Sequence, residues 1–336
     1  MSEGNIYVQT NEPGRNRVIA FGRGADGRLE GMADHETGGA GDGVPHLTSQ
    51  GSVVLSGDGR YLLVANAGSG DVGVFAVGDG LELLATVPTG AAPKSIAEHE
   101  GLVYVLNTGG PSLAGFRLGD GLEPIEGSRR ELPAGSDPAQ AGFTPDGSAL
   151  VVTDRGTDSI AIYPVGPDGV LGEPRVQPSS GPTPYGFAFT GDGTLLVTEA
   201  FGAQTGKAAA SSYRVHDASA TPVSRSVGNG RSEICWAVVS KDERYVFTTN
   251  FADGAVSRYA IRPDGSIELD DAVAGTSVAG EKGLRDEALS GDGRFLYAID
   301  TDHGRIVGWQ VGDGGRLDAV GAWEGVPATV AGLAAS

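Results

Sequence analysis

The sequence is poor in residues that cross-link small domains or bind metals. Cys235 is the only cysteine among 336 residues, so no disulfide can form within the chain and no cysteine cluster can bind zinc. The five histidines are scattered, and none has the spacing to a second histidine that is typical of metal ligands. We therefore expect neither a bound metal nor a cofactor.

Basic residues and long apolar runs are also scarce. The chain has 24 Lys and Arg against 43 Asp and Glu, a formal net charge of −19. This charge repels phosphate backbones and anionic lipids, so we expect no nucleic-acid or membrane partner, and nothing in the sequence indicates a protein partner. No apolar run approaches the roughly 18 residues of a membrane span, and residues 1–5 lack the features of a secretory signal. We expect a soluble, cytoplasmic protein, although an exported mature form would give the same pattern.

Helical periodicity of useful length is absent, whereas glycine is abundant. The 56 Gly and 18 Pro are spread evenly along the chain, and aromatic residues make up 7%. This composition is typical of many short strands joined by tight turns. No linker or shift in composition marks a boundary, so residues 1–336 are predicted to form a single domain.

A turn of the form Gly/Pro-Asp-Gly recurs along the chain, as at 57–59, 145–147 and 291–293. Its period is roughly 45 to 50 residues, the length of a four-stranded propeller blade. After each turn comes an apolar strand that ends in a polar residue, followed by a second strand, as in a hairpin. The seven strand-ending residues are Asn11, Asn66, Asn107, Asp154, Glu199, Asn250 and Asp300. The sequence therefore predicts an all-β, seven-bladed β-propeller.

The first and last repeats are incomplete in complementary ways. The first repeat begins at Ile6 with its second strand, whereas residues 326–333 have the pattern of an inner strand without a blade. We expect the C-terminal strand to complete the N-terminal blade and close the ring, which removes the open sheet edges.

The repeats at 56–66, 142–147 and 289–297 resemble those of lactonase-type seven-bladed propellers, a family that includes bacterial 6-phosphogluconolactonases and fungal carboxymuconate-lactonising enzymes. Segments 137–140, 183–189, 199–202 and 235–236 resemble a bacterial, lactonase-like subgroup. The resemblance implies a catalytic His and Arg on inner strands, a Glu at the end of a second strand and further arginines. Glu199 matches the Glu. The inner strands carry Gln140 and Tyr185 where the His is expected, and Phe251 replaces an Arg, so the catalytic set is degenerate.

Residues six or seven positions before each turn should meet at one rim of the central channel. This ring contains Ser52, Lys94, Gln140, Tyr185, Cys235, Trp236, Arg285 and Asp286. Polar and aromatic groups that converge on a concave mouth suit a small-molecule ligand. Side chains that merely fill a tapering channel would give the same pattern.

Glu199 and Arg285 are the candidate catalytic residues. Glu199 is the only Glu among the strand-ending residues and could act as general acid or base. The loop 201–212 that follows it could form a wall or lid of the site. Alternatively, Glu199 is a solvated loop residue without a role. Arg285 and Lys94 are the only cations in the predicted ring and could bind a carboxylate or an oxyanion, unless Arg285 pairs with Asp286.

The other candidates are ligand-binding residues. They are Lys94, Gln140, Tyr185, Trp236, Asp286 and His46. His46 could reach the rim from the loop before an inner strand. Cys235 is interpreted as a core residue rather than a nucleophile. Two functions remain open: a hydrolase or isomerase acting on a small lactone or carboxylate, and a non-catalytic propeller that binds a metabolite or a protein through its rim.

Overall fold

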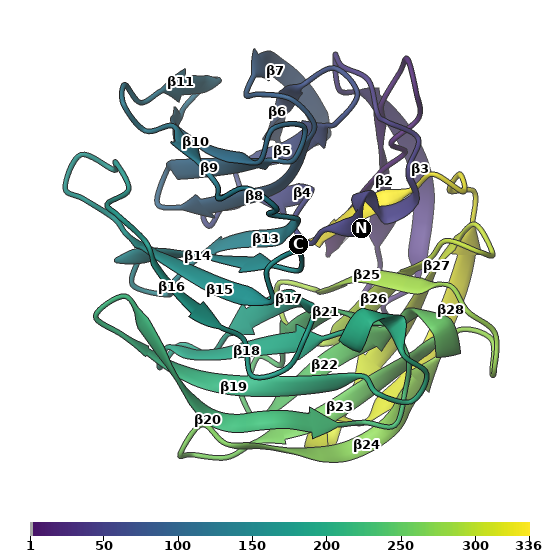
Figure 1. Cartoon of the computed structure of the whole chain (residues 1–336). Helices are drawn as coiled ribbons and strands as arrows, with labels where there is room; N and C mark the ends of the chain where they lie inside the picture. The colour runs from purple at the N-terminus through teal and green to yellow at the C-terminus, as the bar shows by residue number, and fades with distance from the viewer. Residues whose placement is uncertain (1–2) are drawn as a thin grey trace.

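The computed structural model describes residues 3–336 and contains seven antiparallel sheets arranged radially around one axis (Figure 1). Met1 and Ser2, which the sequence prediction included in the domain, lie outside the described residues. The innermost strands of neighbouring blades contact one another around the channel. The predicted seven-bladed propeller is therefore confirmed.

We number the blades along the chain and give each from the innermost strand outward. Blade 1 comprises β29 (Ala331–Ala335), β1 (Gly4–Gln9), β2 (Arg17–Arg23) and β3 (Leu29–Glu36). Blade 2 comprises β4 (Val53–Leu55), β5 (Tyr61–Asn66), β6 (Asp71–Val77) and β7 (Leu81–Pro88). Blade 3 comprises β8 (Pro93–His99), β9 (Leu102–Asn107), β10 (Ser112–Leu118) and an outer edge split into β11 (Leu122–Pro124) and β12 (Arg130–Glu131).

The remaining four blades each have four strands in sequence order. Blade 4 comprises β13 (Pro138–Phe143), β14 (Ala149–Asp154), β15 (Ser159–Pro164) and β16 (Arg175–Pro178). Blade 5 comprises β17 (Pro184–Phe189), β18 (Thr194–Glu199), β19 (Ala209–His216) and β20 (Ser219–Gly228). Blade 6 comprises β21 (Ile234–Val239), β22 (Tyr245–Asn250), β23 (Ala255–Ile261) and β24 (Ile267–Thr276). Blade 7 comprises β25 (Leu284–Leu289), β26 (Phe295–Asp300), β27 (Arg305–Val311) and β28 (Leu317–Glu324).

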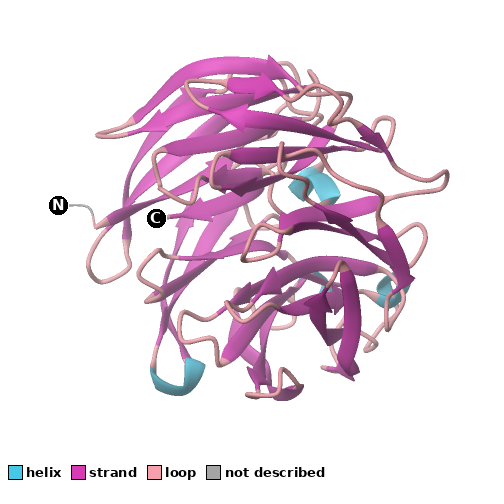
Figure 2. Cartoon of the chain, turned by 90° about the vertical axis from the view of Figure 1, so that its left-hand side faces the viewer, coloured by secondary structure: helices cyan, strands magenta, loops and turns pink. Residues whose placement is uncertain are grey.

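Four short 3-10 helices, drawn in cyan in Figure 2, are the only helices of the described chain. They are η1 (Pro45–Thr48), η2 (Phe201–Ala203), η3 (Phe251–Asp253) and η4 (Asp313–Gly315). Within residues 3–336, no helix is long and apolar enough to cross a membrane.

The recurring Asp-Gly turn has a specific hydrogen-bond pattern. In blade 2 the Asp58 carboxylate accepts hydrogen bonds from the Ser56 hydroxyl at 2.7 Å and from the Arg60 backbone amide at 3.0 Å. The Thr190 hydroxyl donates to Asp192 in the same way in blade 5. The Ser or Thr two residues before each Asp is thus part of the turn, a detail that the sequence analysis missed.

The C-terminal strand closes the ring, as predicted. Strand β29 pairs antiparallel with β1, with Ile6 opposite Ala335, and the two chain ends lie near each other in Figure 1. The predicted segment starts at residue 326, but the strand itself begins at Ala331. The Val330 carbonyl accepts a hydrogen bond from the His46 backbone amide and does not join the ladder. Asn11 also lies two residues beyond the end of β1, so its predicted place as a strand end was wrong.

Packing between neighbouring blades forms the hydrophobic core. Between blades 2 and 3, for example, Leu63 and Val74 pack with Ile96, Val103 and Phe116. Fully burying a side chain of this size contributes about 1.5–3 kcal/mol. Because these clusters surround the channel, the inner strands are held at fixed positions and can present side chains to a common site.

Candidate functional site

A β-bulge near the start of several inner strands builds the channel mouth. In blade 5, Pro184 pairs with Glu199 but Phe187 pairs with Val197, so one residue is extra, and blades 3, 4, 6 and 7 show the same shift. A bulge takes a residue out of the ladder and re-aims its side chain. The second residues of these strands are Lys94, Ala139, Tyr185, Cys235 and Arg285. The bulges thus place these five residues at equivalent positions at one end of the channel.

Aromatic rings form the centre of the mouth. The Tyr185 and Trp236 rings pack edge to face with centroids 5.7 Å apart, and His46 packs edge to face on Trp236 at 5.2 Å. Tyr185, Trp236 and His46 are 5%, 1% and 6% exposed, yet the Tyr185 hydroxyl, Trp236 Nε1 and His46 Nδ1 have no hydrogen-bond partner in the described chain. Buried donors without partners are costly, so this cluster favours a bound ligand or water.

Three cations surround these rings. Burial, and then the charges of Arg285, Arg155 and Lys94, hold the pKa of the His46 imidazole well below its usual range. The Arg155 guanidinium carbon lies 5.1 Å from the centroid of the Tyr185 ring, and its Nη2 pairs with Asp137 at 2.7 Å. Arg155 follows β14 and so lies outside the predicted inner-strand ring; it is a third cation that the sequence analysis missed.

Arg285 is held flat against a neighbouring aromatic residue. Its guanidinium carbon lies 3.6 Å from the centroid of the Phe251 ring, and its Nε donates to the Thr301 hydroxyl at 2.9 Å. Burial lowers the pKa of Arg285 and of Lys94, whose ammonium donates to the Thr48 hydroxyl at 3.2 Å. The Phe251 ring thus orients the Arg of the next blade.

Asp286 lies beside the mouth and has no ion-pair partner among residues 3–336. It is 2% exposed, and neither carboxylate oxygen has a hydrogen-bonding side chain; the Gly332 backbone amide is the main group that favours its charged form. Burial raises the pKa of this carboxyl well above its usual value. Asp286 also acts on the charges of Tyr185 and Cys235, so it belongs to the same cluster.

Gln140 braces the channel wall rather than facing a ligand. Its amide nitrogen donates to the Phe187 carbonyl at 3.1 Å, and its amide oxygen accepts from the Phe187 backbone amide at 2.6 Å. Gln50 makes an equivalent pair of bonds with Ala237 across the channel. Because both hydrogen-bonding groups of Gln140 are occupied by β17, the predicted ligand-binding role does not agree with its position.

Glu199 is not brought together with the mouth residues. Its side chain is fully buried, and the carboxylate accepts bonds from the Gly181 backbone amide at 2.8 Å, the Ser211 hydroxyl at 2.6 Å and the Ser226 hydroxyl at 2.7 Å. All three donors belong to blade 5 itself. Asp154 in blade 4 likewise accepts a bond from the backbone before its inner strand. Glu199 therefore has the structural role of the other strand-ending residues, and the prediction that it reaches the mouth was wrong.

The loop after Glu199 is bonded to the segments that precede β17 and β21, and its role as a wall or lid stays a prediction. Strand β19 begins at Ala209, so the connection is shorter than the predicted segment 201–212. Ala208 donates to the Arg231 carbonyl and Gly206 to the Ser232 hydroxyl, in the segment that leads to blade 6. Cys235 is buried and its pKa is raised to about 12, which agrees with its interpretation as an unreactive core residue.

The η1 turn that carries His46 has an unusual backbone. His46, Leu47 and Thr48 all have left-handed φ angles, of 53°, 51° and 53°, and none is glycine. Left-handed residues of this kind cost about 1–2 kcal/mol each. Leu47 is fully buried against Ala67 and Ala331, which holds the turn in place. Strain that is maintained by surrounding contacts is common at functional sites.

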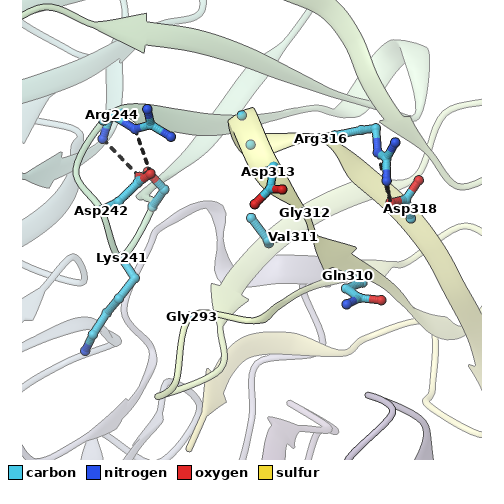
Figure 3. A pocket seen from close by; sticks show the side chains of 13 residues that line it. Lys241, Asp242, Arg244, Gly293, Gln310, Val311, Gly312, Asp313, Arg316 and Asp318 are labelled. Carbon is cyan, nitrogen blue, oxygen red and sulfur yellow. Dashed lines mark hydrogen bonds and ion pairs between the residues drawn. The ribbon is translucent and has the colours of Figure 1, made fainter.

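The surface cavity shown in Figure 3 is a less convincing site. It has a volume of about 530 Å³ and lies between the turn after β21 and the segment 310–318 of blade 7. Its charges are already paired locally, Arg244 with Asp242 at 2.8 Å and Arg316 with Asp318 at 2.6 Å. The turn lies at the end of β21 opposite to Cys235 and Trp236, so this cavity is separate from the mouth.

Across residues 3–336, no group of three or more His, Cys, Asp or Glu side chains is arranged to hold a metal ion.

Comparisons with known proteins agree with the fold. A Bacteroides fragilis protein provisionally named a 6-phosphogluconolactonase superposes with a TM-score of 0.76 over 100% of this chain and 98% of that chain, at 20% identity. The periplasmic gluconolactonase PpgL of Pseudomonas aeruginosa superposes with a TM-score of 0.75 over 99% and 98%, at 17% identity. No curated protein sequence matches significantly.

The family assignment comes from the sequence profile rather than from these superpositions, which show the fold alone. The profile described as "Lactonase, 7-bladed beta-propeller" matches residues 114–204 and 198–328, more than half of the chain. The chain therefore belongs to the lactonase family of seven-bladed β-propellers.

Proposed function

We propose that the channel mouth binds a small anionic lactone or carboxylate and hydrolyses the lactone. The observation that carries this proposal is the convergence of three cations on one buried aromatic cluster, in a protein whose net charge is −19. Arg155 lies over Tyr185, Arg285 lies over Phe251, which packs against the cluster, and Lys94 bonds to the turn that carries His46. Cations placed in a strongly acidic protein favour an anionic ligand, because guanidinium and ammonium groups stabilise carboxylates and developing oxyanions. Membership in the lactonase family supports a lactone as substrate.

In this proposal Asp286 replaces Glu199 as the acid–base group. Its carboxylate is unpaired, and burial raises its pKa, which makes it a stronger base than an exposed Asp. Asp286 takes a proton from water while the water oxygen bonds to the lactone carbonyl carbon, and Arg285 stabilises the negative charge on the carbonyl oxygen. The ring C–O bond then breaks, and the ring oxygen receives the proton to give a hydroxy acid. The reaction needs no cofactor.

The test is turnover of a panel of γ- and δ-lactones, including glucono-δ-lactone. We expect Asp286→Asn and Arg285→Met to lower kcat/KM about 100-fold or more, the usual effect of removing a group that stabilises the transition state. Two matched controls should stay within about twofold: Glu199→Gln, a buried carboxylate outside the mouth, and Arg244→Met, a turn arginine at the opposite end of β21. Turnover of no lactone, or turnover insensitive to both mouth variants, would reject the proposed hydrolysis.

A non-catalytic binding function is the second candidate, and Phe251 favours it, because this residue removes one of the arginines expected for the family's chemistry. A hydroxy acid that raises the unfolding temperature of the wild type but not of Arg285→Met, and that is recovered unchanged, would support binding alone. Consumption of the ligand would reject it.

A further inference from the structure

The His46 ring lies in the mouth, where the charges of Arg285, Arg155 and Lys94 all act on it. It packs on Trp236, it is 6% exposed, and its Nδ1 has no hydrogen-bond partner within the described residues. A neutral imidazole gains little from three surrounding cations, whereas an anion at this position would gain from all of them. The ring therefore fills a place whose electrostatics suit a different occupant.

The turn that carries His46 is held down by contacts that a ligand could replace. Three consecutive left-handed residues strain its backbone, and Leu47 anchors it against Ala67 and Ala331. The Lys94 ammonium also donates to the Thr48 hydroxyl at 3.2 Å. An anion that binds Lys94 would compete with this bond, so ligand binding and release of the turn are linked.

We propose that the η1 turn is an autoinhibitory lid, in which His46 fills the ligand position and a small anion bound by Lys94, Arg155 and Arg285 displaces it. The inference rests on the proposed anion site but does not require catalysis. Release of the strained backbone favours the open state, and burial of Leu47 together with the His46–Trp236 contact favours the closed one. The described structure is the closed state.

Protonation of His46 should open the same lid. The charges that act on His46 belong to Lys94 of β8, Arg155 after β14 and Arg285 of β25. The other titratable groups of the same cluster are Tyr185 of β17, Cys235 of β21 and Asp286 of β25, with Asp42 and Asp137 near Lys94. The three that act on His46 most strongly are cations, so the closed state disfavours the imidazolium. The open state exposes the ring and binds a proton in the ordinary histidine range. Opening is therefore favoured as the pH falls through that range.

The single cysteine provides a probe of the lid. Cys235 is buried in the same cluster as Trp236, so its reaction with 4,4′-dithiodipyridine reports opening of the mouth without competing thiols. We expect His46→Gly, which removes the ring at a left-handed position, to react at least tenfold faster than the wild type at pH 7.5. His46→Phe keeps an aromatic ring but cannot be protonated. The ratio of the wild-type rate to the His46→Phe rate, which cancels the pH dependence of the thiol itself, should rise severalfold between pH 7.5 and 5.5.

Sulfate serves as the anion probe because its charge is constant over this pH range. It should accelerate modification of the wild type relative to chloride at equal ionic strength, and have little effect on His46→Gly. Circular dichroism checks the fold, and His46→Asn, which tolerates left-handed φ, replaces His46→Gly if that variant unfolds.

Equal rates for the wild type and both ring-free variants, or a ratio that does not change with pH, would overturn the lid. The two proposals can fail separately. If no lactone is consumed but the variants and low pH still expose Cys235, the lid stands and the catalytic proposal fails. If lactones are hydrolysed while the His46 variants leave the exposure of Cys235 unchanged, the catalytic proposal stands and the lid fails.

Discussion

Replacing Glu199 separates a structural role from a catalytic one. In Glu199→Ala, the Gly181 amide and the hydroxyls of Ser211 and Ser226 lose their acceptor in a fully buried site. Each buried donor left unsatisfied costs about 1–3 kcal/mol, and part of this is offset because the costly burial of a charge is removed, so we expect a net loss of about 3 kcal/mol. In Glu199→Gln, the amide oxygen can keep the two bonds now made to Oε1, and the Ser226 hydroxyl can rotate to accept from the amide nitrogen. We expect this change to cost less than about 1 kcal/mol.

Urea unfolding followed by circular dichroism measures these differences, and lactone turnover is measured on the same samples below the unfolding transition. Both variants should keep wild-type turnover once corrected for the folded fraction. A Glu199→Gln protein with wild-type stability but no activity would refute our reasoning, because it would show that the carboxylate takes part in the chemistry despite its burial within blade 5.

Three further predictions concern the scaffold. Gln140→Leu should lower the free energy of unfolding by about 2–4 kcal/mol in urea titrations, because two buried backbone groups of β17 lose their partners. Gln177→Leu breaks a similar pair of bonds near the outer edge and should lower it less. Equal losses in the two variants would contradict this. Gly332→Ala should lower the free energy of unfolding by about 1–3 kcal/mol, because φ is +64° and a Cβ would lie 2.3 Å from the Ser52 hydroxyl oxygen. Gly193→Ala, at φ +83° with free space around it, should lower it by about 1 kcal/mol. A lower melting temperature for Gly193→Ala than for Gly332→Ala would contradict the predicted steric clash. Hydrogen bonds lower the pKa values of the turn carboxylates, that of Asp58 to about 2 through Ser56 and Arg60. These carboxylates stabilise the fold at pH values above the ordinary Asp pKa, so the free energy of unfolding should fall as the pH drops from about 4 towards 2. A urea midpoint that stays constant or rises over that range would contradict this.

The sequence predicted the ring of blades because its signals are local and repeated. Most turns carry an Asp and a glycine, and each second strand after a turn ends in a polar residue at nearly the same distance, so a degenerate repeat is identified by its neighbours. Asn11 shows the limit, since the first repeat has no turn of its own to fix the register and its strand ends two residues earlier, at Gln9.

The site was harder to predict because it depends on bulges that no local pattern marks. Without the bulges, Gln140 counts as a mouth residue, whereas in the structure Ala139 takes that position and Gln140 turns to β17. Arg155 was missed because only inner strands were aligned. Comparison of the residues that follow each strand end would have placed Arg155 at the position of Phe251.

The same bulges explain how the mouth can change while the fold is retained. A bulged residue has no partner in the ladder, so Lys94, Tyr185, Cys235 and Arg285 can occupy equivalent positions in different blades although they differ in size and charge. Their replacement alters the chemistry of the channel without breaking a backbone hydrogen bond of the sheet. Family membership therefore determines the ring of blades but not the reaction, and the cations of the mouth can differ between members of the family. The separate contributions of Arg155 and Arg285 to the proposed anion binding are thus a more direct measure of its function than membership of the family.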